Sequence, residues 1–273
     1  MTTYLLLTVF FGYLAGAVLY FLSFELQSEA LYRPAKLVVF GSILFHGALL
    51  PSSFIQNPHF SITTLAEYLE VVSFLMIAIS FAVEWRAKTR FLLLFSLPIV
   101  LVFCFLAVLL AHQKQPAALM THLPGWLWIH TGLILSGFTS LIVSVSSALM
   151  YLLQSAQLKS KHPGPAFLKL PSLDTLDRLH FVSLSAGVVL FSLGIASGFI
   201  WARQMKEFLE ILKDPKVSLS FLTCLMYWTI LSFRLSALRR GQKIAMGTVF
   251  IFIFLFITLL SSIYAPSGFH RGF

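Results

Sequence analysis

One histidine stands in an unusual place, inside the long apolar run between Gly125 and Gln154. His130 lies about one turn into this run, shortly after Trp126 and Trp128. If the run crosses a membrane, lipid offers the imidazole no hydrogen-bonding partner. A water-lined cavity, a buried partner or a metal such as heme iron could each satisfy it. These three alternatives remain open from this stretch alone.

Six of the eight histidines lie toward one side of the membrane when the loops are assigned to the two sides by their charge, as described below. Only His162 and His180 fall on the opposite side or at its surface. Imidazole is the commonest metal ligand, and two imidazoles from separate helices can hold heme iron between them. Solvation alone would account for the histidines in loops, whereas the apolar surroundings of His46 and His130 require a partner. The histidines on the first side are His46, His59, His112, His122, His130 and His270.

Two carboxylates begin the third apolar stretch. Thr64-Leu-Ala-Glu67 matches a capping box, in which the hydroxyl and the carboxylate satisfy free N–H groups of the first helical turn. This local role is sufficient to explain Glu67. Glu70 lies one turn deeper and needs a partner, for which Arg203 and a cavity water are both candidates.

No set of residues with enzymatic spacing is present, so we expect that the protein is not an enzyme. The sequence contains no phosphate-binding loop, nucleophile elbow, HExxH motif or pair of carboxylates at catalytic spacing. Cys104 and Cys224 both lie in apolar stretches without a CxxC motif, and we interpret them as small buried side chains.

The composition predicts an all-α polytopic membrane protein. Hydrophobic residues make up 58% of the chain and charged residues 11%, against about 45–50% and about 25% in soluble proteins. A membrane-spanning helix needs about 20 apolar residues, and we expect eight transmembrane helices in one bundle, without a β domain. The apolar stretches are Tyr4–Phe24, Leu37–Phe54, Thr64–Val83, Phe91–Ala111, Trp126–Leu153, His180–Ala202, Val217–Phe233 and Ile244–Tyr264.

The loops predict a single membrane domain with two halves. Residues 1–154 form a five-helix front half and residues 179–273 a three-helix back half, separated by the long loop 155–178. The segment 203–216 has one apolar face on an otherwise charged helix, which is typical of a helix in the membrane interface. A short connector covering the bundle is the alternative. The N-terminal stretch lacks the marks of a cleaved signal peptide, so we expect it to be the first span.

The basic residues predict the orientation. The odd-numbered loops contain 13 of the 19 lysines and arginines, which places these loops in the cytoplasm. Both termini are therefore expected on the external, periplasmic side of the inner or plasma membrane. The net charge of +9 follows from loops that face anionic headgroups, so it does not indicate nucleic-acid binding.

Several segments resemble, in their order and spacing, the cytochrome c assembly family of membrane proteins. The resemblance is good over residues 126–273 and looser before them. In the first half, the start of the third stretch at Glu67 and the membrane-embedded His46 resemble the family pattern. In the second half the segments are Trp128-Ile-His130-Thr-Gly-Leu-Ile-Leu-Ser, Leu149-Met-Tyr-Leu-Leu-Gln154, Leu173-Asp-Thr-Leu-Asp-Arg-Leu, Ser192-Leu-Gly-Ile-Ala-Ser-Gly-Phe-Ile-Trp201-Ala, Asp214-Pro-Lys216 and Phe269-His270-Arg-Gly-Phe273.

The resemblance implies that the protein binds heme b non-covalently. His130 and His270 would be the two axial ligands at the external face, and His46 would belong to a second, intramembrane heme position. Glu67, at the Glu-containing start of the corresponding helix, would be a further cofactor-binding residue. The implied partners are heme and other proteins of cytochrome c maturation or heme biosynthesis.

Two departures place the chain nearest the HemX-type branch of this family. The segment Arg203–Lys213 contains no tryptophan, although the cytochrome c synthases present heme with a tryptophan-rich segment there. The seventh stretch reads Leu231-Ser-Phe-Arg234, where the synthases have a second membrane histidine. Two other functions therefore remain open: regulation of heme biosynthesis through glutamyl-tRNA reductase levels, and a heme-free structural or transport subunit.

Overall fold

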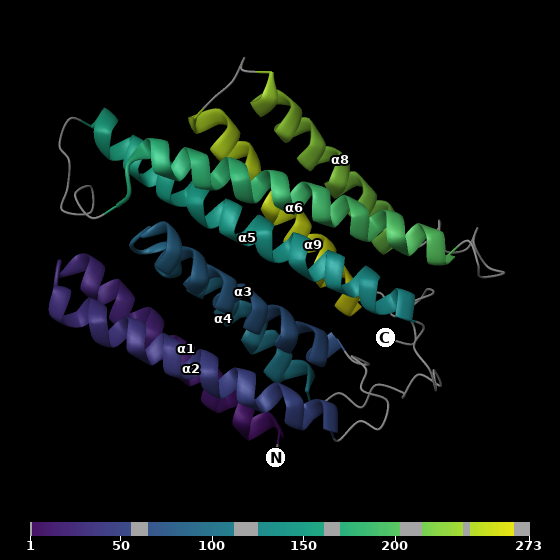
Figure 1. Cartoon of the computed structure of the whole chain (residues 1–273), viewed down its shortest axis with the longest axis horizontal. Helices are drawn as coiled ribbons and strands as arrows, with labels where there is room; N and C mark the ends of the chain where they lie inside the picture. Colours follow the sequence, from purple (N-terminus) through teal and green to yellow (C-terminus); the bar gives the residue numbers. More distant parts are fainter. Residues whose placement is uncertain are drawn as a thin grey trace. The chain divides into compact units, whose positions relative to one another are not determined.

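Long helices make up nearly all of the described chain. The computed structural model describes residues 2–55, 65–111, 125–160, 170–202, 215–236 and 241–264, in which no strand occurs. Eight helices are long and apolar enough to cross a membrane, which confirms the prediction of an all-α polytopic membrane protein. They are α1 (Thr2–Glu25), α2 (Glu29–Ile55), α3 (Leu65–Ala87), α4 (Leu92–Leu110), α5 (Gly125–Lys159), α6 (Leu173–Ala202), α8 (Pro215–Leu235) and α9 (Gln242–Tyr264) (Figure 1).

Three helices extend by six residues or more, at one end, beyond the apolar stretches that predicted them. α2 begins at Glu29 rather than Leu37, and α6 begins at Leu173 rather than His180. α5 continues to Lys159, past Leu153. The apolar stretch ends where charged residues begin, but backbone hydrogen bonding continues through charged residues that can reach water. The missed turns matter, because they carry polar contacts described below.

The described helices belong to two compact units. Residues 1–116 and 153–173 form the first unit, and residues 117–152 and 174–273 form the second. The first four helices belong to the first unit and most of α5 clusters with the helices that follow it, whereas the sequence grouped it with the helices before it. The single membrane domain stays a prediction.

In the first unit, α1 packs against α2 and α4, and α3 packs against α4 and α2. Two glycines allow α1 and α2 to approach closely. A Cβ atom on Gly12 would lie 2.5 Å from the Ser42 hydroxyl oxygen, and one on Gly16 would lie 2.5 Å from Val39 Cγ2. Small residues four positions apart are the usual means by which membrane helices approach each other.

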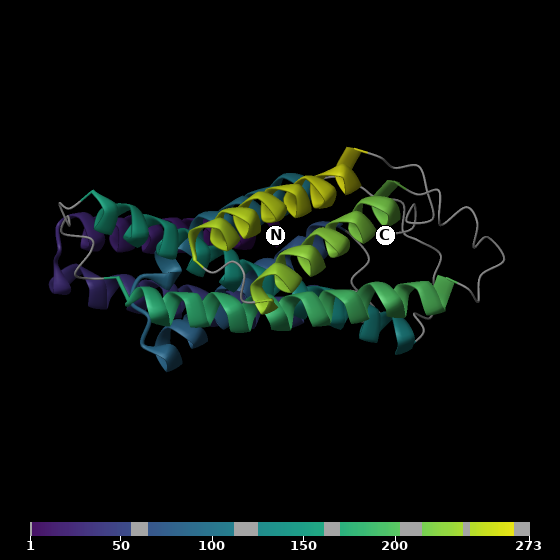
Figure 2. The same cartoon turned by 90° about the horizontal axis from the view of Figure 1, so that it is seen from above.

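In the second unit, α8 packs against α9 (Figure 2), and α5 lies against α6 through glycines on both helices. A Cβ atom on Gly137 of α5 would lie 2.6 Å from the backbone nitrogen of Phe191 on α6. One on Gly187 of α6 would lie 2.8 Å from the Leu141 side chain of α5. Residue numbers fall along α6 as they rise along α5, so the two helices are antiparallel. The same register brings the beginning of α5 to the end of α6.

Candidate functional site

His130 is bound to α6 through one nitrogen of its ring. The Nδ1–H group donates a hydrogen bond of 2.8 Å to the backbone oxygen of Gly194, and Ser197 Oγ lies 3.3 Å from the same nitrogen. A carbonyl oxygen can only accept, so the proton of the neutral imidazole lies on Nδ1. Nε2 therefore carries the lone pair, and no described residue hydrogen bonds to it.

Three small residues of α6 form the surface on which this ring lies, which we call the α6 shelf: Gly194, Ser197 and Gly198. Positions i, i+3 and i+4 share one face of a helix. A Cβ atom on Gly198 would lie 2.8 Å from Cε1 and 3.0 Å from Nδ1 of His130. Ser197 in turn donates to the Gly194 oxygen at 2.6 Å. The shelf leaves room for the ring and holds its orientation.

This arrangement is the one that metal-ligating histidines adopt, with one N–H donated to a backbone carbonyl and the other nitrogen available to the metal. Within the described part of the chain, no group of three or more histidine, cysteine or acidic residues could hold a metal ion. A site that takes a single protein ligand from this part of the chain suits heme iron, since the porphyrin supplies the equatorial ligands. The sequence offered a buried partner and a metal as alternatives for His130. One imidazole can have both, because Nδ1 bonds to α6 and Nε2 stays available to a metal.

The other sequence-predicted site residues either lie outside the described residues or belong to the first unit. His270 and most of the segment 203–216 lie outside the described residues, and Pro215–Lys216 begin α8. Glu67 is in the first turn of α3, as predicted, but it belongs to the first unit. Its proposed capping partner Thr64 is also outside the described residues.

His46 is buried in the first unit and has different surroundings. Its side chain is 1% exposed, its ring meets Phe74 edge-on, and its Nδ1 lies 3.1 Å from the Tyr13 hydroxyl. If Tyr13 donates, only the Nε2–H group lacks a described partner. If His46 donates, both the phenol proton and the Nε2 lone pair lack one. The first arrangement leaves fewer groups unsatisfied, and in it Nε2 bears a proton and cannot bind a metal.

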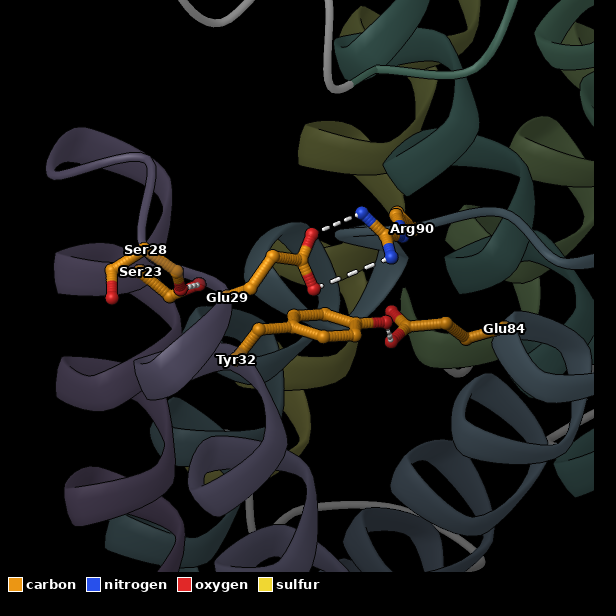
Figure 3. Close-up of polar contacts among 6 residues, drawn as sticks. All are labelled: Ser23, Ser28, Glu29, Tyr32, Glu84 and Arg90. Atoms are coloured by element: carbon orange, nitrogen blue, oxygen red, sulfur yellow. Dashed lines mark hydrogen bonds and ion pairs between the residues drawn. The ribbon is translucent and has the colours of Figure 1, made fainter.

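The sequence analysis missed a buried carboxylate at the other end of α3 (Figure 3). Glu84 accepts hydrogen bonds from the hydroxyls of Tyr20 and Tyr32, both at 3.0 Å, and from the backbone N–H of Leu93 at 2.9 Å. We call this group the Glu84 clasp. Each of α1, α2, α3 and α4 contributes to it. Because Glu84 stands among charged residues next to an expected loop, its sequence context gave no signal of burial.

A surface ion pair covers the clasp. Arg90 binds Glu29, with nitrogen–oxygen distances of 2.5 and 3.4 Å, and its guanidinium lies 5.3 Å from the centre of the Tyr32 ring (Figure 3). Nearby, the Ser23 hydroxyl donates to the Ser28 oxygen in the turn between α1 and α2. Glu29 and Tyr32 make these contacts. Both lie in the part of α2 that precedes its predicted start.

The second unit also has polar contacts away from His130. Arg234 of α8 forms an ion pair with Asp177 of α6. His180 is buried, with its Nε2 3.0 Å from the Thr248 hydroxyl of α9. The sequence analysis placed His180 at the cytoplasmic surface. That position relative to the membrane stays a prediction, and the structure adds that α6 begins at Leu173, two turns before the histidine.

The helices and the histidine site define a class: a polytopic helical membrane protein with an imidazole hydrogen bonded to a neighbouring helix near the start of a span. The model of the cytochrome c assembly protein family matches residues 5–270, and the chain belongs to this family. The family prediction is thereby confirmed.

The chain is similar to known members of two kinds. It is 28% identical to Protein HemX of Brevibacillus brevis over 272 residues, which cover 97% of this chain and 96% of that protein. It is 26% identical to Protein HemX of Bacillus subtilis (77% and 76% covered). It is 22% identical to the cytochrome c biogenesis protein CcsA of Guillardia theta (81% and 79% covered).

Proposed function

We propose that the protein binds and handles heme b in the membrane, with His130 Nε2 as an axial ligand of the iron. The observation that carries this proposal is the hydrogen bond from His130 Nδ1 to the Gly194 carbonyl, which leaves Nε2 unprotonated. His270 is proposed as the second axial ligand. The two imidazoles would hold the iron that heme supplies and would protect it from unwanted reactions.

The chain's own residues would hold and orient the heme. The α6 shelf fixes the ring plane and the tautomer of His130, so little rearrangement is needed when the iron binds. The similarity to HemX and CcsA proteins supports a role in heme handling. The partners are proposed to be proteins of cytochrome c maturation or heme biosynthesis.

We further propose that the chain is not an enzyme and does not by itself attach heme to apocytochrome. Its sequence lacks tryptophan in Arg203–Lys213, where a synthase would hold the porphyrin. The charge distribution supports a location in the inner or plasma membrane, with His130 and His270 at the external face.

The first test is the absorbance spectrum of the purified protein, oxidised and reduced, after expression with sufficient heme. We expect the bands of low-spin heme, and we expect His130→Ala or His270→Ala to abolish or convert them. His162→Ala is the matched control and should leave the spectrum unchanged. Low-spin bands that survive in the His130→Ala, His270→Ala double variant would exclude this site. A wild-type protein that takes up no heme would favour the regulatory alternative.

A further inference from the structure

Helix α3 contains two buried carboxyl groups, one near each end. Glu70 is 4% exposed and Glu84 is 2% exposed, and both lie within the membrane-spanning part of the helix. An ionised carboxylate in an apolar interior is costly unless it is paired or hydrogen bonded. The surroundings of the two groups therefore indicate whether each one is a charged carboxylate or a neutral acid.

Glu84 is surrounded by groups that stabilise an anion. Its oxygens accept from the two phenol groups and the backbone N–H of the clasp, all at about hydrogen-bonding distance. Leu93 lies in the first turn of α4, where the helix dipole favours negative charge. The charge of Lys36 also acts on Glu84. These three donors favour the carboxylate form of Glu84 over the neutral acid.

Glu70 has none of these stabilising groups among the described residues. Its Oε1 atom is buried without a hydrogen-bond partner. The nearby Ser73 hydroxyl donates instead to the backbone oxygen of Glu70, at 2.8 Å. No described lysine or arginine acts on Glu70, and the charged group that does is Glu67, which has the same sign.

The described residues of the helices that pack against α3 also bring no cation to Glu70. From α4 the facing titratable group is the thiol of Cys104, which lies near Ser73. From α2 it is His46, whose ring packs on Phe74 one turn along α3 from Glu70. A carboxyl group in this setting is stable as the neutral acid, which needs no counter-charge.

We propose that Glu70 is a proton-binding site of the first unit. The carboxyl group holds the proton as a neutral acid inside the span and exchanges it with water, without any change of oxidation state. Loss of the proton leaves a negative charge in the apolar interior of α3. The proposal does not rest on heme binding, because His130 belongs to the second unit.

Infrared spectroscopy of the full-length protein in lipid tests this protonation state at neutral pH. We expect a carboxylic-acid carbonyl band in the wild type, and we expect Glu70→Gln to remove it. Glu84→Gln is the matched control, since it removes a buried carboxyl of the same helix and should leave the band. The exposed Glu25→Gln on α1 provides a second control that does not disturb the clasp. A band that persists in Glu70→Gln, or no band in the wild type, would overturn the proposal.

A chemical measurement on the unmodified chain complements the spectra. Dicyclohexylcarbodiimide enters apolar regions, and a protonated carboxyl adds to it, with its oxygen bonding to the central carbon and its proton passing to nitrogen. Mass spectrometry should find the adduct on Glu70 and not on Glu84, and the yield should fall as the pH is raised. Modification of Glu84 in preference to Glu70 would contradict the assignment.

Discussion

At the scale of single residues, a hydrogen bond between each histidine and its neighbour decides which ring nitrogen is available. The Gly194 carbonyl places the proton of His130 on Nδ1, whereas the Tyr13 phenol favours a proton on Nε2 of His46. The two histidines were equal candidates on the basis of their apolar surroundings. The structure thus leaves Nε2 of His130 available for the proposed ligation, whereas at His46 it favours a hydrogen bond to Tyr13.

Gly198→Ala should weaken heme binding, because the new Cβ would lie 2.8 Å from the His130 ring and displace it from Gly194. Loss of such a supporting contact typically lowers metal affinity by roughly 10–100-fold. Heme titration followed by absorbance measures the change. Gly132→Ala on α5 is the matched control, since a Cβ there meets nothing within 4 Å. Equal affinities for the two variants would show that the shelf does not position the histidine.

At the scale of helices, the α5–α6 contact is what brings the site together. Gly137 and Gly187 let the two backbones approach, and their antiparallel register sets His130 against Gly198. Close backbone approach through small residues is a main source of association between helices in lipid, where hydrophobic burial contributes little.

Gly137→Leu should destabilise the second unit, because its side chain would meet the backbone of Phe191 and force the helices apart. Overpacking of this kind costs about 1–3 kcal/mol or more. Thermal unfolding in detergent should show a midpoint several degrees lower than that of the wild type. Gly132→Leu, which introduces the same side chain into open space on the same helix, should stay near the wild-type midpoint. The opposite ranking would contradict the described register.

At the scale of the whole molecule, the basic loops predict that both termini face outward. A reporter enzyme that needs an oxidising external compartment, fused after Phe273, should therefore be active. The same fusion point should give no activity with a reporter that works only in the cytoplasm. Activity of the cytoplasmic reporter alone would reverse the proposed topology and place His130 at the inner face.

The sequence by itself determined the membrane class, the eight helices and the family. The membrane class and the helices follow from local properties, since about 20 consecutive apolar residues must span the bilayer as a helix. The family was inferred from the resemblance of several segments in their order and spacing. It also singled out His130, because an imidazole in an apolar stretch needs a partner. The first residues of α2 and α6 were predicted too late in the sequence, because the helical hydrogen bonds extend beyond the apolar residues.

Only the tertiary structure decided which groups those residues meet. The partner of His130 is a backbone carbonyl 64 positions away, and Tyr20 lies 64 positions from Glu84. Such pairs depend on the register and closeness of packed helices, which no local pattern specifies. The same reason explains the two glutamates of α3: one helix carries both carboxyl groups, and only their neighbours on other helices distinguish an anion from an acid.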